Sequence, residues 1–182
     1  TYQSVSGAGK SAMEGLARQT AELLNAKSVT GEEFSRQIAF NAIPQIDEFM
    51  ENDYTKEEMK MVWETRKILG NDNILVNATA VRVPVFYGHG EAIHIETQQQ
   101  IDAQDVKSLL ATAPGITLYD DREAFPTQVS SASGNDGVHV GRVRNDISHS
   151  HGINMWVVSD NIRKGAATNS IQIAELLIRD YL

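Results

Sequence analysis

Residues 81–97 read VRVPVFYGHGEAIHIET, and this stretch decides which sheet the chain can form. β-Branched and aromatic residues fill 74–87 and 91–97, so the pattern predicts two strands. The glycines on either side of His89 predict a turn between those strands. Because Pro84 has no backbone N–H to donate, the first strand is expected to have an edge or a bulge at that residue.

Arg82 and His89 are the two side chains of this stretch best suited to chemistry. Alternation along a strand places Arg82 opposite the valines, where its planar guanidinium can clamp a carboxylate; an exposed arginine in a surface ion pair is the alternative. The glycines minimise crowding around His89, and histidine titrates near neutrality. His89 is therefore the best candidate general base among the five histidines, and a solvated turn histidine is the alternative.

The segments around this stretch show helical and strand-like patterns without a regular βαβ repeat. Thr55 and Glu58 form a capping-box pattern at the start of a strong helix, which Gly70 ends. Further helices are predicted over 10–25, 102–113 and 162–182, the second of them capped by Asp102. The other predicted elements are short strands over 116–119, 138–144 and 154–159, an irregular connection over 37–54 and a polar loop over 128–137. This order predicts an α+β fold with helices on one face of a sheet.

Two further groups of polar residues are candidates for binding a ligand or a metal ion. Glu57 and Lys60 lie one turn apart on the polar face of the helix, where they can bind an ammonium group and an anion, or simply pair with each other. His149 and His151 are too few for a metal site without further ligands, and a polar loop is the better account. No metal site is predicted.

Composition narrows the classes of function. The chain has 182 residues, enough for one domain or one domain with an appendage, and its net charge of -8 argues against nucleic-acid binding. It contains no cysteine, which excludes a disulfide, a thiolate metal site or a cysteine nucleophile within these residues. No apolar run is long enough for a membrane span and no signal-peptide pattern is present, so a cytoplasmic protein is expected. The start at Thr1 suggests a fragment or a processed chain.

Six blocks in order along the chain resemble the aspartate-β-semialdehyde dehydrogenase family. These blocks are TYQSVSGAGK (1–10), NAIPQID (41–47), EEMKMVWETRKIL (57–69), VRVPVFYGHGEA (81–92), GRVRND (141–146) and SDNIRKGAATNSIQIAELL (159–177). The resemblance covers the family's substrate-binding and dimerisation domain. It implies a mixed, largely antiparallel sheet like that of the carboxy-terminal domain of glyceraldehyde-3-phosphate dehydrogenase.

The resemblance also implies roles for individual residues. Gln3 matches a glutamine that orients the substrate, Glu57 the acid that meets its ammonium group, and Lys60 the lysine associated with its phosphate. Arg82 matches the arginine that binds the substrate carboxylate, and His89 the acid/base histidine. Positions that match the nicotinamide end of the cofactor site are Asn161, Gly165 and Ala166.

Members of the family interconvert aspartyl phosphate and aspartate semialdehyde, with phosphate and NADP as the other reactants, in lysine, threonine, methionine and diaminopimelate biosynthesis. Their cysteine nucleophile and most of the NADP site belong to an amino-terminal Rossmann domain outside these residues, so this chain alone is expected to be inactive. A homodimer is expected. Residues 1–164 are expected to form the substrate-binding and dimerisation domain, and 165–182 a helix that packs on the Rossmann domain.

Two other functions stay open. One is a free-standing dimerisation module without catalysis. The other is a reductase of N-acetyl-glutamyl phosphate, whose acylated amine has no charge for Glu57 to bind. Glu57 therefore favours aspartyl phosphate.

Overall fold

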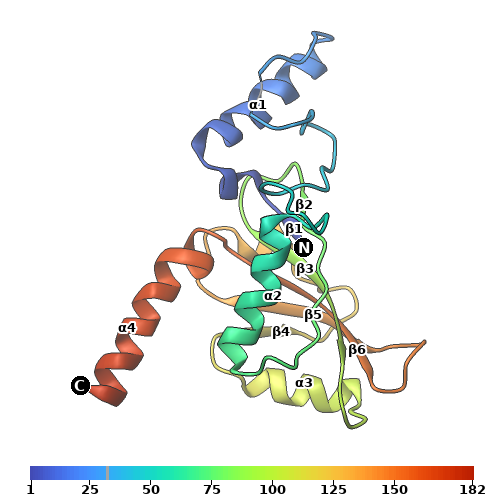
Figure 1. The fold of residues 1–182 in the computed structure, drawn as a ribbon, viewed down its shortest axis with the longest axis vertical. Coiled ribbons are helices and arrows are strands. Elements are labelled where there is room, and N and C mark those ends of the chain that lie inside the picture. Colours follow the sequence, from blue (N-terminus) through green and yellow to red (C-terminus); the bar gives the residue numbers. More distant parts are fainter. Residues whose placement is uncertain (32) are drawn as a thin grey trace. The chain divides into compact units, whose positions relative to one another are not determined.

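The computed structural model describes residues 1–31 and 33–182 (Figure 1). Two compact units follow one another along the chain, Thr1–Phe86 and Tyr87–Leu182. Within the described ranges, no helix has the length and apolar character needed to cross a membrane.

The first unit pairs two very short strands, β1 (Tyr2–Gln3) and β2 (Val81–Arg82), in parallel. Its helices are a 3₁₀ turn η1 (Val5–Ala8), α1 (Lys10–Leu24) and α2 (Lys56–Leu69). The predicted strand over 74–87 is therefore wrong for most of its length. Pro84 explains part of the difference: the Val85 N–H bonds to the Val83 carbonyl around it, which bends the chain, and pairing resumes where the Val5 N–H meets the Val85 carbonyl.

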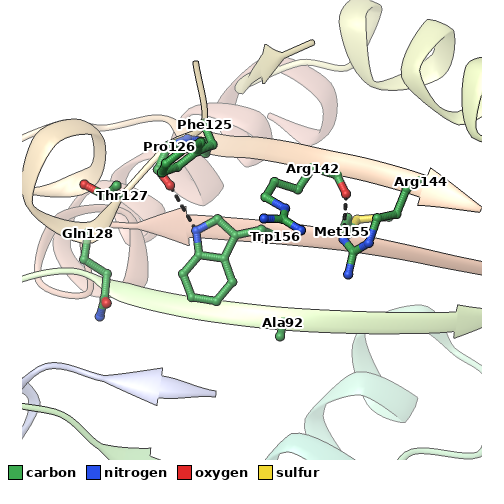
Figure 2. Close-up of a pocket in the computed structure, with 9 residues that line it drawn as sticks. All are labelled: Ala92, Phe125, Pro126, Thr127, Gln128, Arg142, Arg144, Met155 and Trp156. Carbon is green, nitrogen blue, oxygen red and sulfur yellow. Dashed lines mark hydrogen bonds between the residues drawn. The ribbon is translucent and has the colours of Figure 1, made fainter. Parts of the chain in front are cut away.

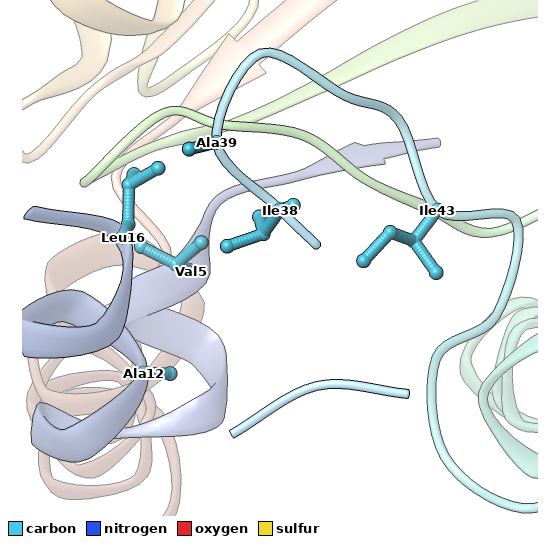
Figure 3. Close-up of a cluster of buried hydrophobic side chains, with 6 residues drawn as sticks. All are labelled: Val5, Ala12, Leu16, Ile38, Ala39 and Ile43. Atoms are coloured by element: carbon cyan, nitrogen blue, oxygen red, sulfur yellow. The ribbon is translucent and has the colours of Figure 1, made fainter. Parts of the chain in front are cut away.

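Apolar side chains from η1, α1 and the irregular connection make the core of the first unit (Figure 3). Its buried members are Val5, Ala12, Leu16, Ile38, Ala39 and Ile43. The backbone of the irregular connection needs partners of its own, and Gln19 supplies them: its Oε1 accepts the N–H groups of Ile38 at 3.0 Å and Ala39 at 3.2 Å. One buried glutamine thus joins α1 to a segment without regular structure.

The capping box at the start of α2 is present as predicted. Glu58 N–H donates to Thr55 Oγ1 at 3.3 Å, and Thr55 N–H donates to Glu58 Oε2 at 2.8 Å. The other carboxylate oxygen of Glu58 accepts the Ala80 N–H at 2.9 Å. Glu58 therefore fixes α2 to the residue that precedes β2.

The second unit is built on four strands in the order β3-β6-β5-β4. These are β3 (His89–Glu96), β4 (Ile116–Tyr119), β5 (Val138–Asn145) and β6 (Gly152–Ser159); the helical elements are α3 (Ala103–Thr112), single π-turns η2 (Gln128–Ala132) and η3 (Arg163–Ala167), and α4 (Thr168–Tyr181). β6 is antiparallel to both neighbours, whereas β4 and β5 are parallel. With the parallel pair β1–β2, these pairings confirm an α+β fold with a mixed sheet.

Helix α3 packs on the sheet of the second unit, where the buried side chains of Val140, Val143 and Ile153 form the core. Asp102 caps this helix through the Gln104 N–H, as its sequence pattern predicts. By contrast, no residue of α4 is buried, and the helix extends away from the strands of its unit (Figure 1). Its apolar side chains Ile171, Ile178 and Leu177 are exposed.

The predicted turn over 88–90 is also wrong. His89 and Gly90 are already in β3, where they pair with Ser159 and Val158 of β6. Gly88 alone has the left-handed backbone expected of a turn glycine, with a φ of 84°. His89 is thus the first residue of a paired strand and not the centre of a turn.

Candidate functional site

The four predicted substrate-binding side chains all belong to the first unit, and two of them meet at Glu57. Gln3 Nε2 donates to Glu57 Oε1 at 3.1 Å, and Lys60 Nζ lies 2.9 Å from Glu57 Oε2. Gln3 and Arg82 are paired residues in the β1–β2 ladder. Three elements therefore supply one charged cluster, defined as Gln3 of β1, Glu57 and Lys60 near the start of α2, and Arg82 of β2.

Arg82 is buried rather than exposed, which excludes the reading of a surface ion pair. Its side chain is nearly inaccessible, and Nη1 donates to the Ser4 carbonyl at 2.8 Å. Its backbone is paired on both sides, with Gln3 in β1 and with Ile43 through two hydrogen bonds. The Arg82 backbone is thus fixed on two sides, and the Ser4 carbonyl orients its guanidinium.

The cluster carries two cations and one carboxylate. Burial lowers the pKa of Arg82, while the charge of Glu57 acts against that shift; a guanidinium still keeps its charge at any physiological pH. The hydrogen bond that Lys60 donates to Glu57 is the main cause of the raised pKa of Lys60, which burial opposes. An excess of one positive charge suits a ligand that has more negative than positive groups.

His89 belongs to the second unit, where the preceding residue is held on both sides. Gly88 N–H donates to Asn161 Oδ1 at 3.0 Å, and the Gly88 carbonyl accepts a hydrogen bond from Gln128 Nε2 at 2.8 Å. Of the predicted cofactor-binding residues, Asn161 is therefore joined to the residue next to His89. Gly165 lies close to Asn161, because a Cβ built on Gly165 would be 3.8 Å from Asn161 Cβ.

Asp160 organises the turn that carries these predicted cofactor-binding residues. Its carboxylate accepts N–H groups from Gly134 at 2.8 Å and from Ile162 and Arg163 at 2.8 and 3.0 Å. Burial acts to raise the pKa of Asp160, but these backbone donors outweigh it and the pKa is lowered. The Asp160 carbonyl also accepts the Gly165 N–H at 3.0 Å. Ala166 follows in the same π-turn and is exposed.

A cavity of about 340 Å³ opens on the sheet face of the second unit that carries Trp156 (Figure 2). Arg142 and Arg144 both line it, on the same face as the preceding Gly141, because a bulge in β5 places two residues opposite one residue of β6. Figure 2 shows the Arg142 guanidinium beside the Trp156 ring and the Arg144 guanidinium farther along the strand, where its Nη1 donates to the Arg142 carbonyl at 2.8 Å. Trp156 Nε1 donates to the Pro126 carbonyl at 3.0 Å. Its described lining residues include no carboxylate.

Several residues that shape these sites had no signal in the sequence. Gln128 lies in the segment predicted as a polar loop, and nothing in its composition indicated a partner at Gly88. Ser4 contributes only a backbone carbonyl, which any residue type provides. Glu58 was predicted as a helix cap, but its second bond, to Ala80, joins residues far apart in the chain.

These features describe an α+β domain with a charged cluster beside short strands and a histidine at the start of a sheet strand. A family model described as the semialdehyde dehydrogenase dimerisation domain matches residues 1–164, and the chain belongs to that family.

The most informative relatives are aspartate-semialdehyde dehydrogenases. The chain is 66% identical, over 100% of its length, to the enzyme of Shewanella violacea, of which the match covers 54%. A crystal structure of aspartate semialdehyde dehydrogenase II from Vibrio cholerae complexed with ASA has a TM-score of 0.96 at 64% identity, covering 100% of this chain and 54% of that one. The enzyme of Candida albicans with NADP has a TM-score of 0.59 at 29% identity, covering 78% and 45%. The chain thus spans about half the length of the curated relatives it matches. The division into 1–164 and 165–182 stays a prediction.

Proposed function

We propose that this chain is the substrate-binding and dimerisation part of an NADP-dependent aspartate-semialdehyde dehydrogenase. The enzyme interconverts L-aspartyl-4-phosphate and L-aspartate 4-semialdehyde in the cytoplasm, in the pathway to lysine, threonine, methionine and diaminopimelate. The charged cluster of the first unit carries this proposal. An aspartyl substrate has a carboxylate, an ammonium group and a phosphate, and the cluster has a charge of opposite sign for each of them.

Each residue of the cluster then has one role in binding the substrate. Arg82 binds the substrate carboxylate, Glu57 accepts hydrogen bonds from the ammonium group, and Gln3 orients the reacting end. Lys60, whose ammonium group is partly exposed, exchanges its contact with Glu57 for one with phosphate. Glu57 argues against an N-acetyl-glutamyl substrate, because an acylated amine offers it no positive charge.

His89 is the acid/base group. In the oxidative direction it takes the thiol proton of a cysteine, contributed by a segment outside these residues, as the sulfur bonds to the aldehyde carbon. Bound NADP+ would supply the hydride acceptor for oxidation of that carbon, and phosphate would then displace the sulfur as a thiolate to give the acyl phosphate. Because Gly165 and Ala166 are exposed and small beside Asn161, they leave room for a nicotinamide ring. Most of the NADP contacts are assigned to the same outside segment.

A chimera tests this function directly. Residues 1–182 replace the matching segment of the Vibrio cholerae enzyme, which supplies the remaining half of the molecule. The chimera is expected to reduce NADP with aspartate semialdehyde and phosphate, whereas the isolated chain is expected to be inactive. An inactive chimera that folds and dimerises would instead support a dimerisation module without catalysis.

The role of His89 is tested in the same chimera. His89→Ala is expected to lower kcat by about 10²–10⁴-fold, the usual effect of removing a general acid–base group. His94→Ala is the matched control, because His94 is an exposed histidine of the same strand. Normal turnover in the His89→Ala chimera would overturn the acid/base assignment.

A further inference from the structure

Two side chains of the second unit hold the backbone next to His89. Gly88 is bonded at both its N–H, by Asn161, and its carbonyl, by Gln128. The carbonyl bond acts on the peptide group that joins Gly88 to His89. Its direction therefore determines where the Cα of His89 lies and where its side chain begins.

The glycines on both sides of His89 serve close packing. A Cβ on Gly88 would lie 3.0 Å from the Gln128 carbonyl oxygen and 3.2 Å from Ala132 Cβ. A Cβ on Gly90 would lie 2.7 Å from the Trp156 ring and 3.4 Å from Gln128 Cδ. The glycines thus allow Gln128 and Trp156 to press against the strand on each side of the histidine, instead of leaving the histidine free to move.

Gln128 is itself on a fixed support. Gln128 is the first residue of the π-turn η2 and follows its cap, Thr127. The Thr127 carbonyl accepts the N–H groups of Ser131 and Ala132, which fixes this turn. Trp156 Nε1 donates to the Pro126 carbonyl two residues before Gln128. After the turn, the Gly134 N–H is held by Asp160. Because hydrogen bonds fix the chain both before and after η2, the Gln128 side chain can determine the position of the strand that it contacts.

We propose that Gln128 and Asn161 are positioning residues that clamp the Gly88 peptide and thereby aim His89 for proton transfer. This inference rests on the proposed function, in which His89 is the acid/base group. Neither residue exchanges a proton in this role. Gln128 contributes a donor to a backbone carbonyl, and Asn161 contributes an acceptor to a backbone N–H.

The test compares variants of Gln128 in the chimera. Gln128→Leu removes the donor with little change in volume, and Gln128→Glu keeps the shape but replaces the donor with an acceptor. Both are expected to lower kcat by about 10- to 100-fold, because misplacing a reacting group by about 1 Å costs that much. The KM for aspartate semialdehyde is expected to change less than twofold, and the pH profile of kcat is expected to shift on the limb assigned to His89. Gln104→Leu, at an exposed glutamine of α3, is the control.

A spectroscopic arm separates this inference from the proposed function. In the 15N-histidine-labelled chimera, Gln128→Leu is expected to shift the amide and ring signals of His89 and to speed hydrogen exchange of its amide. Unchanged His89 signals, or unchanged kcat and pH profile while His89→Ala is inactive, would overturn the clamp. If His89→Ala stays active, the acid/base role fails, and the His89 signals alone decide whether Gln128 positions the residue.

Discussion

Arg82 is fixed in position although it belongs to a strand of only two residues. β2 contains only Val81 and Arg82, yet the arginine backbone is bonded on two sides and its side chain on a third. Burial removes competing water, so a charge-assisted hydrogen bond to a ligand carboxylate is stronger there than at a surface.

Replacing Arg82 tests the carboxylate clamp. Arg82→Leu in the chimera is expected to raise the KM for aspartate semialdehyde and lower kcat, with a loss of about 1.5–3 kcal/mol of binding in the transition state, the value of a hydrogen bond to a charged group. Arg82→Lys keeps the charge without the planar fork and is expected to recover only part of the loss. Steady-state kinetics equal to those of the unchanged chimera would show that Arg82 does not bind the substrate carboxylate.

His139 predicts how the second unit responds to acid. The residue is buried in β5, its Nδ1 lies 3.3 Å from Tyr119 Oη, and its Nε2 has no hydrogen-bond partner among the described residues. Burial lowers the pKa of His139. Above about pH 6.5, the unfolded value, both states leave the imidazole neutral and His139 adds no pH dependence. As pH falls below that value, the unfolded chain binds the proton first and stability declines until the folded-state pKa is passed.

His139→Phe is therefore expected to flatten the acid side of the stability curve. The difference in unfolding free energy between the two proteins should change by no more than about 1.4 kcal/mol per pH unit, the limit for one proton. Urea unfolding followed at several pH values measures it. Parallel curves for the two proteins would show that His139 does not titrate on unfolding.

At the scale of elements, α2 depends on one carboxylate. Glu58→Ala removes the acceptor for both the Thr55 and Ala80 N–H groups. Leaving two donors unsatisfied is expected to lower the unfolding free energy by about 2–4 kcal/mol. Glu58→Gln keeps one acceptor oxygen and should cost about half as much. The exposed Glu64 of the same helix provides the control, with Glu64→Ala expected within about 0.5 kcal/mol of the unchanged chain.

Local patterns in the sequence predicted those elements that local physics determines. The capping box at Thr55 and the Asp102 cap needed only residues three or fewer positions away. The strand over 74–87 was overpredicted, because β-branched residues indicate a tendency and not a partner. Only Val81 and Arg82 find pairing partners that make a strand, and Pro84 bends the chain soon after.

The candidate site likewise combines residues that the sequence indicates with contacts between distant residues that it does not. Arg82, Glu57 and Lys60 are candidates from their positions on a strand and a helix, whereas Gln3 is a candidate only from its match to a family. The structure adds the contacts among Gln3, Glu57 and Lys60. Gln128 was not predictable, because its partner Gly88 is 40 residues away and its segment reads only as a polar loop. Such contacts depend on tertiary packing, which the periodicity and composition of a sequence do not reveal.

At the scale of the molecule, the sheet face of the second unit that carries Trp156 is a candidate surface for dimerisation. The family is named for dimerisation, and the cavity on this face joins the apolar Ala92 and Trp156 with two arginines. We propose that a second copy covers this face. An apolar surface with two arginines and no carboxylate among its described lining residues suits a partner that brings both apolar area and acceptors.

Ala92→Arg tests that surface by adding a third cation to the cavity. It is expected to weaken the dimer by at least about tenfold, because like charges brought together at an interface are costly. The control is Ala111→Arg, an identical change at an exposed residue of α3, the helix on the other face of the sheet. Analytical ultracentrifugation of the chimera gives the dissociation constants, and equal values for the two variants would move the dimer contact elsewhere.

The bulge in β5 has a consequence for how this sheet tolerates changes of chain length. An added residue in a strict ladder would turn every later side chain to the opposite face. Here the extra residue is absorbed at Arg142, and Val143 still reaches the core with Val140. Arg142 has a φ of 55°, a left-handed backbone that costs a residue with a Cβ about 1–2 kcal/mol. Glycine would fold more easily at this position, so the arginine is retained there against the preference of its own backbone.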